Sequence, residues 1–327
     1  LALPVALFAL SALTLILLAT ANPALAARVY VTNEKGNDVT VLDDETLEVV
    51  GHYPVGNRPR GITLSPDGRE LYVCASDDDL VRVFDPQTMQ ETHTLPSGPD
   101  PELFVLSPDG GRLYIANEDD NLVTVVDTKT HQMLAEIPVG VEPEGMGVSP
   151  DGKTVINTSE TTNMAHFIDT ETYQITANVL VDQRPRFAEF TADGKTLFVS
   201  AEIGGTMSVI DPATQTVVKT IGFQIPGVLP EAIQPVGIRA TRDGSKVFVA
   251  LGPANRVAVI DGESLEVTDY ILVGQRVWQL AFNADQSRLY TTNGNSNDVT
   301  VIDVASGRAL KSIQVGQQPW GVVVAPE

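Results

Sequence analysis

The apolar and polar positions of this chain form short runs that return with a period of about forty residues. Each period contains a strand that opens with an aromatic residue or valine, and successive openings lie 42, 42, 41, 43, 50 and 42 positions apart. The seven openings are Tyr30, Tyr72, Tyr114, Val155, Phe198, Phe248 and Tyr290. Such a period is typical of a β-propeller, because one four-stranded blade cannot bury both its faces without neighbours.

The second period shows how one unit is built. Residues 61–64 form a nearly continuous apolar run, and a Ser-Pro-Asp-Gly turn at 65–68 separates it from a second run at 71–75. Two further runs follow at 81–84 and 91–95, again separated by turn residues. Four short strands with tight connections predict one antiparallel up-and-down blade.

The two ends of the chain predict how the ring closes. The first expected strand, 29–32, aligns with the second strand of a unit, and the last, 321–324, aligns with the first strand of a unit. We therefore expect the N- and C-terminal strands to pair in one blade, which removes an open sheet edge. The seven inner strands begin near Gly61, Leu103, Gly145, Phe187, Gly237, Gln279 and Gly321. The predicted fold is an all-β, seven-bladed propeller over residues 27–327.

Two turns recur in every unit. The first is an aspartate followed three positions later by Thr or Ser: Asp43/Thr46, Asp85/Thr88, Asp127/Thr130, Asp169/Thr172, Asp211/Thr214, Asp261/Ser264 and Asp303/Ser306. Each aspartate stands without the clustered carboxylates that calcium needs, so a structural turn is favoured over a calcium site. The second turn precedes each third strand at Asn37, Asp79, Asn121, Asn163, Gly205, Asn255 and Asn297, residue types that tolerate left-handed backbone.

Residues 1–26 differ from the rest of the chain. Positions 1–18 are largely apolar, and Ala24 and Ala26 place small residues where a signal peptidase reads them. We interpret 1–26 as a secretory signal peptide whose basic n-region is missing, the alternative being a retained membrane anchor. After cleavage the protein is expected to be periplasmic, soluble, monomeric and free of the membrane.

Charge and cysteine content exclude several classes of protein. The net charge is −21 and the pI about 4.4, which opposes nucleic-acid binding because a basic stripe is needed to release counterions. Cys74 is the only cysteine, so no intrachain disulfide, cysteine-ligated zinc or attached haem is expected. Its place inside an apolar strand indicates a buried, inert thiol.

The linkers between units carry the differences between repeats. In an up-and-down blade they share one end of the ring, here called the linker face, with the Asn-type turns. The Ser-Pro-Asp-Gly turns share the opposite end, here called the Ser-Pro-Asp-Gly face. Entering each inner strand are Arg60, Glu102, Glu144, Arg186, Val236, Trp278 and Trp320, and two positions earlier are Arg58, Asp100, Glu142, Arg184, Gln234, Arg276 and Gln318.

Arginine and tryptophan are frequent binding anchors, so this ring is the candidate site. The candidate ligand- or partner-binding residues are Arg58, Arg60, Glu102, Glu144, Arg184, Arg186, Arg276, Trp278 and Trp320. We expect acidic and basic sectors to lie apart; a solvated rim that only keeps the face soluble is the alternative. The fifth linker carries an apolar, proline-rich insertion at 222–230, which predicts a lip over a groove, a partner contact or a passive extension.

The repeats resemble those of the YVTN β-propeller family. The resemblance rests on Tyr-Val-Thr-Asn at 30–33, Tyr-Ile-Ala-Asn at 114–117 and Tyr-Thr-Thr-Asn at 290–293, with Val-Gly-x-x-Pro-x-Gly at 139–145. It covers residues 27–327, while units four to six depart from the tetrapeptide. Seven repeats behind an export signal are most similar to periplasmic propellers associated with PQQ-dependent alcohol catabolism. This family has no shared catalytic residues to transfer.

The sequence favours a binding protein over an enzyme. The four histidines, His52, His93, His131 and His166, align with third or fourth strands away from the channel mouth, and no phosphate loop or nucleophile elbow is present. No cofactor and no metal are predicted. We expect a periplasmic protein or small ligand to bind the linker face, accessory to PQQ-dependent alcohol catabolism or a transport system. The alternative is a lactonase or hydrolase using a cation held by Glu102 and Glu144; local single-strand nucleic-acid binding is a third interpretation.

Overall fold

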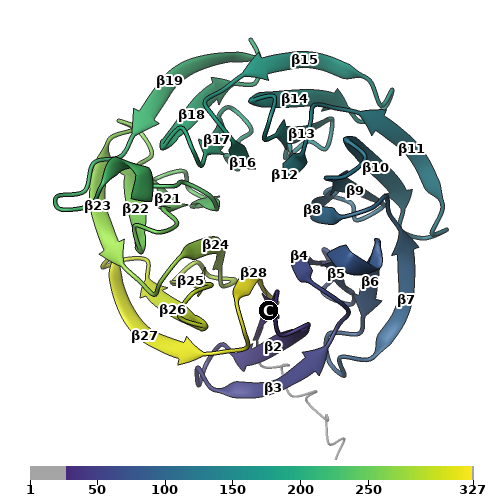
Figure 1. Ribbon diagram of the computed structural model, residues 1–327, viewed down its shortest axis with the longest axis horizontal. Coiled ribbons are helices and arrows are strands. Elements are labelled where there is room, and N and C mark those ends of the chain that lie inside the picture. The colour runs from purple at the N-terminus through teal and green to yellow at the C-terminus, as the bar shows by residue number, and fades with distance from the viewer. Residues whose placement is uncertain (1–26, 326–327) are drawn as a thin grey trace, which may run out of the picture.

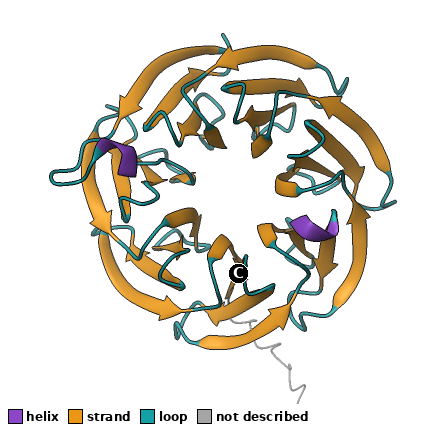
Figure 2. Ribbon diagram, viewed as in Figure 1, coloured by secondary structure: helices purple, strands orange, loops and turns teal. Residues whose placement is uncertain are grey.

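The computed structural model describes residues 27–325 and confirms the seven-bladed β-propeller. Seven four-stranded antiparallel sheets stand in a ring around a central channel (Figure 1). Nearly every element is a strand (Figure 2), and two single turns of 3-10 helix interrupt the described chain at Ser76–Asp78 and Pro230–Ala232. The predicted signal peptide, 1–26, lies outside the described residues. Within 27–325, no helix has the length and apolar character needed to cross a bilayer.

Each blade runs from an inner to an outer strand. Blade one contains β28 (Pro319–Val324), β1 (Arg28–Asn33), β2 (Asp38–Asp43) and β3 (Val49–Pro54); blade two contains β4 (Pro59–Leu64), β5 (Leu71–Ala75), β6 (Leu80–Phe84) and β7 (Glu91–Pro96). Blade three contains β8 (Pro101–Leu106), β9 (Arg112–Asn117), β10 (Leu122–Asp127) and β11 (Met133–Pro138); blade four contains β12 (Pro143–Val148), β13 (Thr154–Ser159), β14 (Met164–Asp169) and β15 (Ile175–Leu180). Blade five contains β16 (Pro185–Phe190), β17 (Leu197–Ala201), β18 (Thr206–Asp211) and β19 (Thr216–Gly222). Blade six contains β20 (Ile238–Ala240), β21 (Lys246–Ala250), β22 (Arg256–Asp261) and β23 (Val267–Leu272); blade seven contains β24 (Val277–Phe282), β25 (Arg288–Asn293), β26 (Asp298–Asp303) and β27 (Arg308–Gln314).

The ring closes as the sequence predicts. β28 pairs antiparallel with β1, with Tyr30 opposite Val323 and Val31 opposite Val322. In Figure 1 the yellow C-terminal strand accordingly lies in the purple N-terminal blade. This pairing completes the blade that contains the N-terminal strand, so β1 is not left as the edge of a three-stranded sheet.

The hydrophobic core lies between neighbouring blades. Tyr30 and Val41 of blade one pack with Val73 and Phe84 of blade two, and equivalent clusters fill the other seams. The Tyr30 hydroxyl, although buried, donates a hydrogen bond to the carbonyl oxygen of Pro86 at 2.9 Å. The aromatic residue that opens the repeat therefore joins adjacent blades by packing and by one polar contact.

Glycines on the inner strands permit a close approach between blades. A Cβ on Gly145 would lie 2.8 Å from the Arg186 carbonyl oxygen, and one on Gly321 would lie 2.5 Å from that of Arg60. Real Cβ atoms do not approach backbone oxygens so closely, so these positions require glycine. The approach brings residues at the same register of successive inner strands within side-chain reach.

The recurrent turns have the predicted chemistry. The Asp43 carboxylate accepts hydrogen bonds from the Thr46 N–H at 2.7 Å and the Thr46 hydroxyl at 2.9 Å, and other units repeat the arrangement. All seven Asn-type turn residues have φ between 55° and 66°. The inner strands of most blades begin two residues earlier than expected, at Pro59 in blade two. His131 occupies a left-handed turn before β11, so its expected place in a strand was wrong.

Candidate binding site at the channel mouth

The Asn-type turns position the linker residues that surround the mouth. Asn163 Oδ1 accepts a hydrogen bond from the Arg184 N–H at 3.1 Å, and Asn255 Oδ1 accepts one from the Arg276 N–H at 2.9 Å. Asn37, Asp79, Asn121 and Asn297 hold Arg58, Asp100, Glu142 and Gln318 in the same way. The six held residues have φ between 49° and 58°. The sequence predicts the left-handed turns, but this contact between turn and linker was missed.

The mouth residues are more buried than a solvated rim would be. Glu102, Glu144, Arg186 and Trp320 are at most 4% exposed, whereas the Arg184 side chain is 46% exposed. Buried charges must pair, because removing an isolated ion from water costs far more free energy than folding supplies. The alternative of a solvated rim therefore does not hold for the inner members of this ring.

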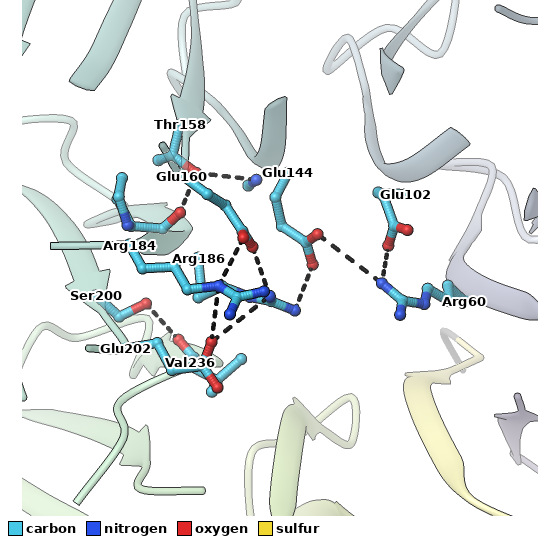
Figure 3. A network of polar contacts seen from close by, with 12 residues as sticks. Arg60, Glu102, Glu144, Thr158, Glu160, Arg184, Arg186, Ser200, Glu202 and Val236 are labelled. Carbon is cyan, nitrogen blue, oxygen red and sulfur yellow. Dashed lines mark hydrogen bonds and ion pairs between the residues drawn. The ribbon is translucent and has the colours of Figure 1, made fainter. Parts of the chain in front are cut away.

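Oppositely charged residues from successive blades interlock at the mouth (Figure 3). Arg186 of β16 pairs with Glu144 of β12 at 2.9 Å, and also contacts Glu160 and Glu202. Arg184 lies 2.6 Å from Glu160 and 3.4 Å from Glu202. The predicted separation into acidic and basic sectors was wrong here, since each guanidinium reaches across a blade boundary to carboxylates on its neighbour.

A second part of the network lies at blades one to three. Arg60 pairs with Glu34 at 3.2 Å and with Glu102, and its guanidinium lies 3.9 Å from Glu144. Arg58 pairs with Glu102 at 2.8 Å and with Asp100. Arg60 thus bridges Glu102 and Glu144, the pair from which the sequence predicts a cation site, and its positive charge stands where that cation would bind (Figure 3).

Four glutamates of the network escaped the sequence analysis. They occupy one register position, directly after the second strand of a unit: Glu34, Glu118, Glu160 and Glu202. The corresponding residues of the other units are Ser76, Gly252 and Gly294. The signal was present, because aligning the residue after each Tyr-Val-Thr-Asn segment reveals four acids in one ring.

The two tryptophans contact arginines at the mouth. The Arg276 guanidinium lies 4.2 Å from the ring centroid of Trp278, and Arg60 lies 5.5 Å from that of Trp320. Arg276 also pairs with Glu202 at 2.7 Å. Burial lowers the pKa of Arg276 from its ordinary value. Trp278 remains partly exposed, so its indole can contact a bound molecule, whereas Trp320 is enclosed.

An acidic corner has more carboxyl groups than arginines can neutralise. Carboxylate oxygens of Asp100, Glu102 and Glu118 lie within 4.8 Å of one another, a spacing compatible with a metal ion. Burial, together with the nearby Glu102, raises the pKa of Glu118 to about 8 and that of Asp100 to about 6. The fit to a cation is partial, because Arg58 already donates to Asp100 and Glu102.

Several buried donors near the channel have no hydrogen-bond acceptor within the described chain. They are Arg186 Nε, Gln279 Nε2 and Trp320 Nε1, on β16, β24 and β28. Buried polar groups are nearly always paired, so these three donors are exceptions, and each is enclosed by the surrounding side chains. No pattern in the sequence indicates a role for Gln279 beyond its place at the start of an expected strand.

The histidines and the fifth linker lie elsewhere. His93 stacks on His131 at 4.1 Å on outer elements, and His166 accepts a hydrogen bond from the Gly140 N–H at 3.0 Å. The insertion of the fifth linker packs at the seam of blades five and six, with Phe223 and Ile233 buried in that cluster. Figure 1 shows it at the outer rim of the ring, so it does not form a lip over the mouth.

Comparison with known proteins supports the fold. No family model and no curated protein sequence matches the chain. Among solved structures, a functionally unknown protein from Desulfotomaculum acetoxidans is similar with a TM-score of 0.78 at 16% identity, over 92% of this chain and 99% of the other. A candidate 6-phosphogluconolactonase from Bacteroides fragilis gives 0.76 at 19% identity, over 93% and 99%. Kuenenia stuttgartiensis hydrazine synthase gives 0.72 at 22%, over 82% and 95%. These likenesses place the chain in the propeller class.

Proposed function

We propose that this protein is a non-enzymatic binding propeller that docks a partner protein on its linker face. The observation that carries the proposal is a set of exposed apolar residues around that face, each between 44% and 66% exposed. They lie at the linker-face ends of blades four to six and their connections: Val141, Leu180, Ile203, Leu229 and Leu272. Exposed apolar groups beside a charged, partly buried centre are characteristic of protein interfaces.

The same sector differs from its counterparts in blades one to three. There the outer strands end with Pro54, Pro96 and Pro138, residues that blunt a sheet edge. In blades four and six they end with Leu180 and Leu272. The fold does not require leucine at this register, so its presence supports a contact surface confined to one side of the ring.

Exposure divides the predicted site residues into two groups. Arg184 and Trp278 are accessible and supply a forked donor and a broad apolar face for the partner. The other seven are buried or partly buried and hold the charge pattern in place: Arg58, Arg60, Glu102, Glu144, Arg186, Arg276 and Trp320. The partner that fits presents apolar side chains to the rim and a carboxylate to Arg184.

We place this protein in the periplasm, as an accessory to PQQ-dependent alcohol catabolism or an associated transport system. This placement rests on the signal-like residues 1–26 and on the resemblance of the repeats. A monomeric propeller with a free linker face is the form that the docking requires.

Capture from a periplasmic extract tests the proposal. Immobilised residues 27–327 should retain a protein that Leu180→Ser and Arg184→Gln release. Leu310→Ser is the matched control, because Leu310 is also exposed but lies in β27 of blade seven. Equal retention by all variants, or retention lost equally with Leu310→Ser, would refute docking on this sector.

A second candidate function is hydrolysis of a lactone with a bound cation. The acidic corner of Asp100, Glu102 and Glu118 favours it, and the fold likeness to the candidate 6-phosphogluconolactonase adds support. Equilibrium dialysis with Ca²⁺, Mg²⁺ and Mn²⁺, followed by a lactone panel, tests it with Glu118→Gln as the variant. Turnover abolished by that variant would support hydrolysis; absence of both metal and turnover would exclude it.

A further inference from the structure

The channel contains a cavity that adjoins the linker-face network at Trp320 and extends away from it. It has a volume of about 420 Å³, within the roughly 300–1,000 Å³ of small-molecule sites. Pro66, Pro108 and Pro150 of the Ser-Pro-Asp-Gly turns line its outer end, and Gln279 and Trp320 line its inner end. It therefore opens on the Ser-Pro-Asp-Gly face, opposite the surface proposed to dock a partner.

Two walls of this cavity differ in chemistry. The inner strands β4, β8 and β12 contribute an apolar wall that includes Ile62, Val105 and Met146. On the other side, three consecutive inner strands contribute Arg239 from β20, Gln279 from β24 and Trp320 from β28, of which Arg239 is the charged one. A ligand that satisfies both walls has an apolar body and an accepting group.

Gln279 and Trp320 contribute little polar surface to this cavity. Gln279 Nε2 and Trp320 Nε1 have no acceptor within residues 27–325, but both nitrogen atoms are buried beneath the cavity surface. Recognition of a polar group in the cavity therefore depends on Arg239, whose side chain is 28% exposed.

Arg239 supplies a positive charge to this wall. Its guanidinium packs over Phe187 at 5.0 Å and makes a long, 3.3 Å contact with Glu189. At the equivalent register, the other inner strands carry the uncharged Thr63, Val105, Gly147, Ala281 and Val323. Arg239 and Glu189 are thus the charged residues of this ring. Arg239 Nη1 also donates to the Ile238 carbonyl oxygen at 2.8 Å, so both of these contacts use Nη1 and the guanidinium retains its other donors for a carboxylate.

We propose that this cavity binds a small organic monocarboxylate with an apolar body. The carboxylate lies toward Arg239, and the body packs against Val105, Met146 and Phe187. The Glu189–Arg239 pair keeps the cavity wall neutral before binding, which limits the desolvation cost of a partly buried arginine. This site is independent of docking on the linker face.

Isothermal titration calorimetry with 3-phenylpropionate tests the proposal, because the probe joins a carboxylate to a short apolar body. We expect saturable binding to one site, and binding at least about tenfold weaker for the uncharged 3-phenylpropan-1-ol, since a charge-assisted hydrogen bond is lost. Absence of saturable binding, or equal affinity for acid and alcohol, would overturn the proposal.

Variants locate the binding. The double variant Arg239→Gln/Glu189→Gln removes the charge without leaving a buried carboxylate unpaired, and should weaken probe binding at least about tenfold. Arg242→Gln is the matched control, because Arg242 is exposed in the adjacent turn and should leave binding unchanged. Val105→Trp fills the cavity and should abolish binding in a protein whose circular dichroism shows it folded. Binding that survives both cavity variants, or falls equally with Arg242→Gln, would refute the site.

Discussion

Arg186 and Glu144, 42 residues apart in sequence, form an ion pair of 2.9 Å whose partners are 4% and 1% exposed. They come from neighbouring inner strands, at the register that each repeat offers to the channel mouth. The repeat spacing therefore brings the two charges together. Because both side chains are buried, each needs the opposite charge of the other. Replacing either one should therefore lower the stability of the fold.

Loss of the Arg186 charge should destabilise the fold strongly. Arg186→Met leaves Glu144 buried with weaker compensation, and we expect a loss of about 3–5 kcal/mol in the free energy of unfolding. Urea denaturation measures it, with Lys195→Met as the control because the Lys195–Asp193 pair is exposed. If Arg186→Met is as stable as the control, the pair is not buried as described. The sequence alone suggests that Arg186 is exposed to solvent, and replacing an exposed arginine would leave the stability of the fold nearly unchanged.

Glu118 should make stability depend on pH. Its pKa rises from 4.5 to about 8 on folding through burial and the neighbouring Glu102, so the folded state binds the proton more tightly than the unfolded state. Its stabilising contribution is complete below pH 4.5 and is lost as pH rises through about 8. Glu118→Gln should therefore gain stability relative to the parent across this window. Thermal unfolding at a series of pH values checks it, with exposed Asp119→Asn as control; parallel curves for parent and Glu118→Gln would contradict it.

Two substitutions at Asn163 should measure separately what backbone conformation and hydrogen bonding contribute to the free energy of unfolding. Asn163→Gly keeps the left-handed backbone but loses the acceptor for Arg184, at about 1 kcal/mol. Asn163→Ala adds the strain of alanine at φ 55°, for a total of about 2–3 kcal/mol. Denaturant midpoints of the two variants give the comparison. Equal losses would show that conformation contributes nothing at this turn.

Close packing of blades should make Gly145 intolerant of alanine. A Cβ there would lie 2.5 Å from Thr158 Oγ1 as well as close to the Arg186 backbone, and we expect a loss of about 1–3 kcal/mol. Gly222→Ala provides the control, because its Cβ would meet nothing within 4 Å. Thermal unfolding of both proteins measures the difference, and an equally stable Gly145→Ala would mean that the blades can separate slightly at the mouth.

The fold was predictable because each local signal agrees with the repeat. Tyr30 and its counterparts set the period, the Asn and Asp turns have the expected conformations, and the pairing of β28 with β1 follows from the strand types at the two ends. Such agreement between local and global signals characterises sequences with one well-defined fold. The first residues of most inner strands were predicted two positions too late, because proline, which begins most of these strands, is also typical of turns.

The site was only partly predictable. The register of Arg186, Glu144 and Trp278 was predicted correctly. The charges of Arg186 and Glu144, however, suggested exposed side chains. The pairing of these residues, 42 positions apart, becomes apparent only in the structure, where neighbouring blades stand side by side. Glu160 and Glu202 were not predicted because they follow the second strands of their blades and lie outside the linkers, which carry the other site residues. The channel cavity, with Gln279 and Arg239, depends on side chains from several blades, and no single repeat contains its pattern.

Hydrogen–deuterium exchange of the protein, with and without the captured partner, tests the central claim most directly. Docking on the linker face should slow exchange in segments 139–144, 181–186 and 222–237, and leave the Ser-Pro-Asp-Gly turns at 65–68 and 149–152 unchanged. Protection confined to those turns, or spread evenly over all seven blades, would contradict the account.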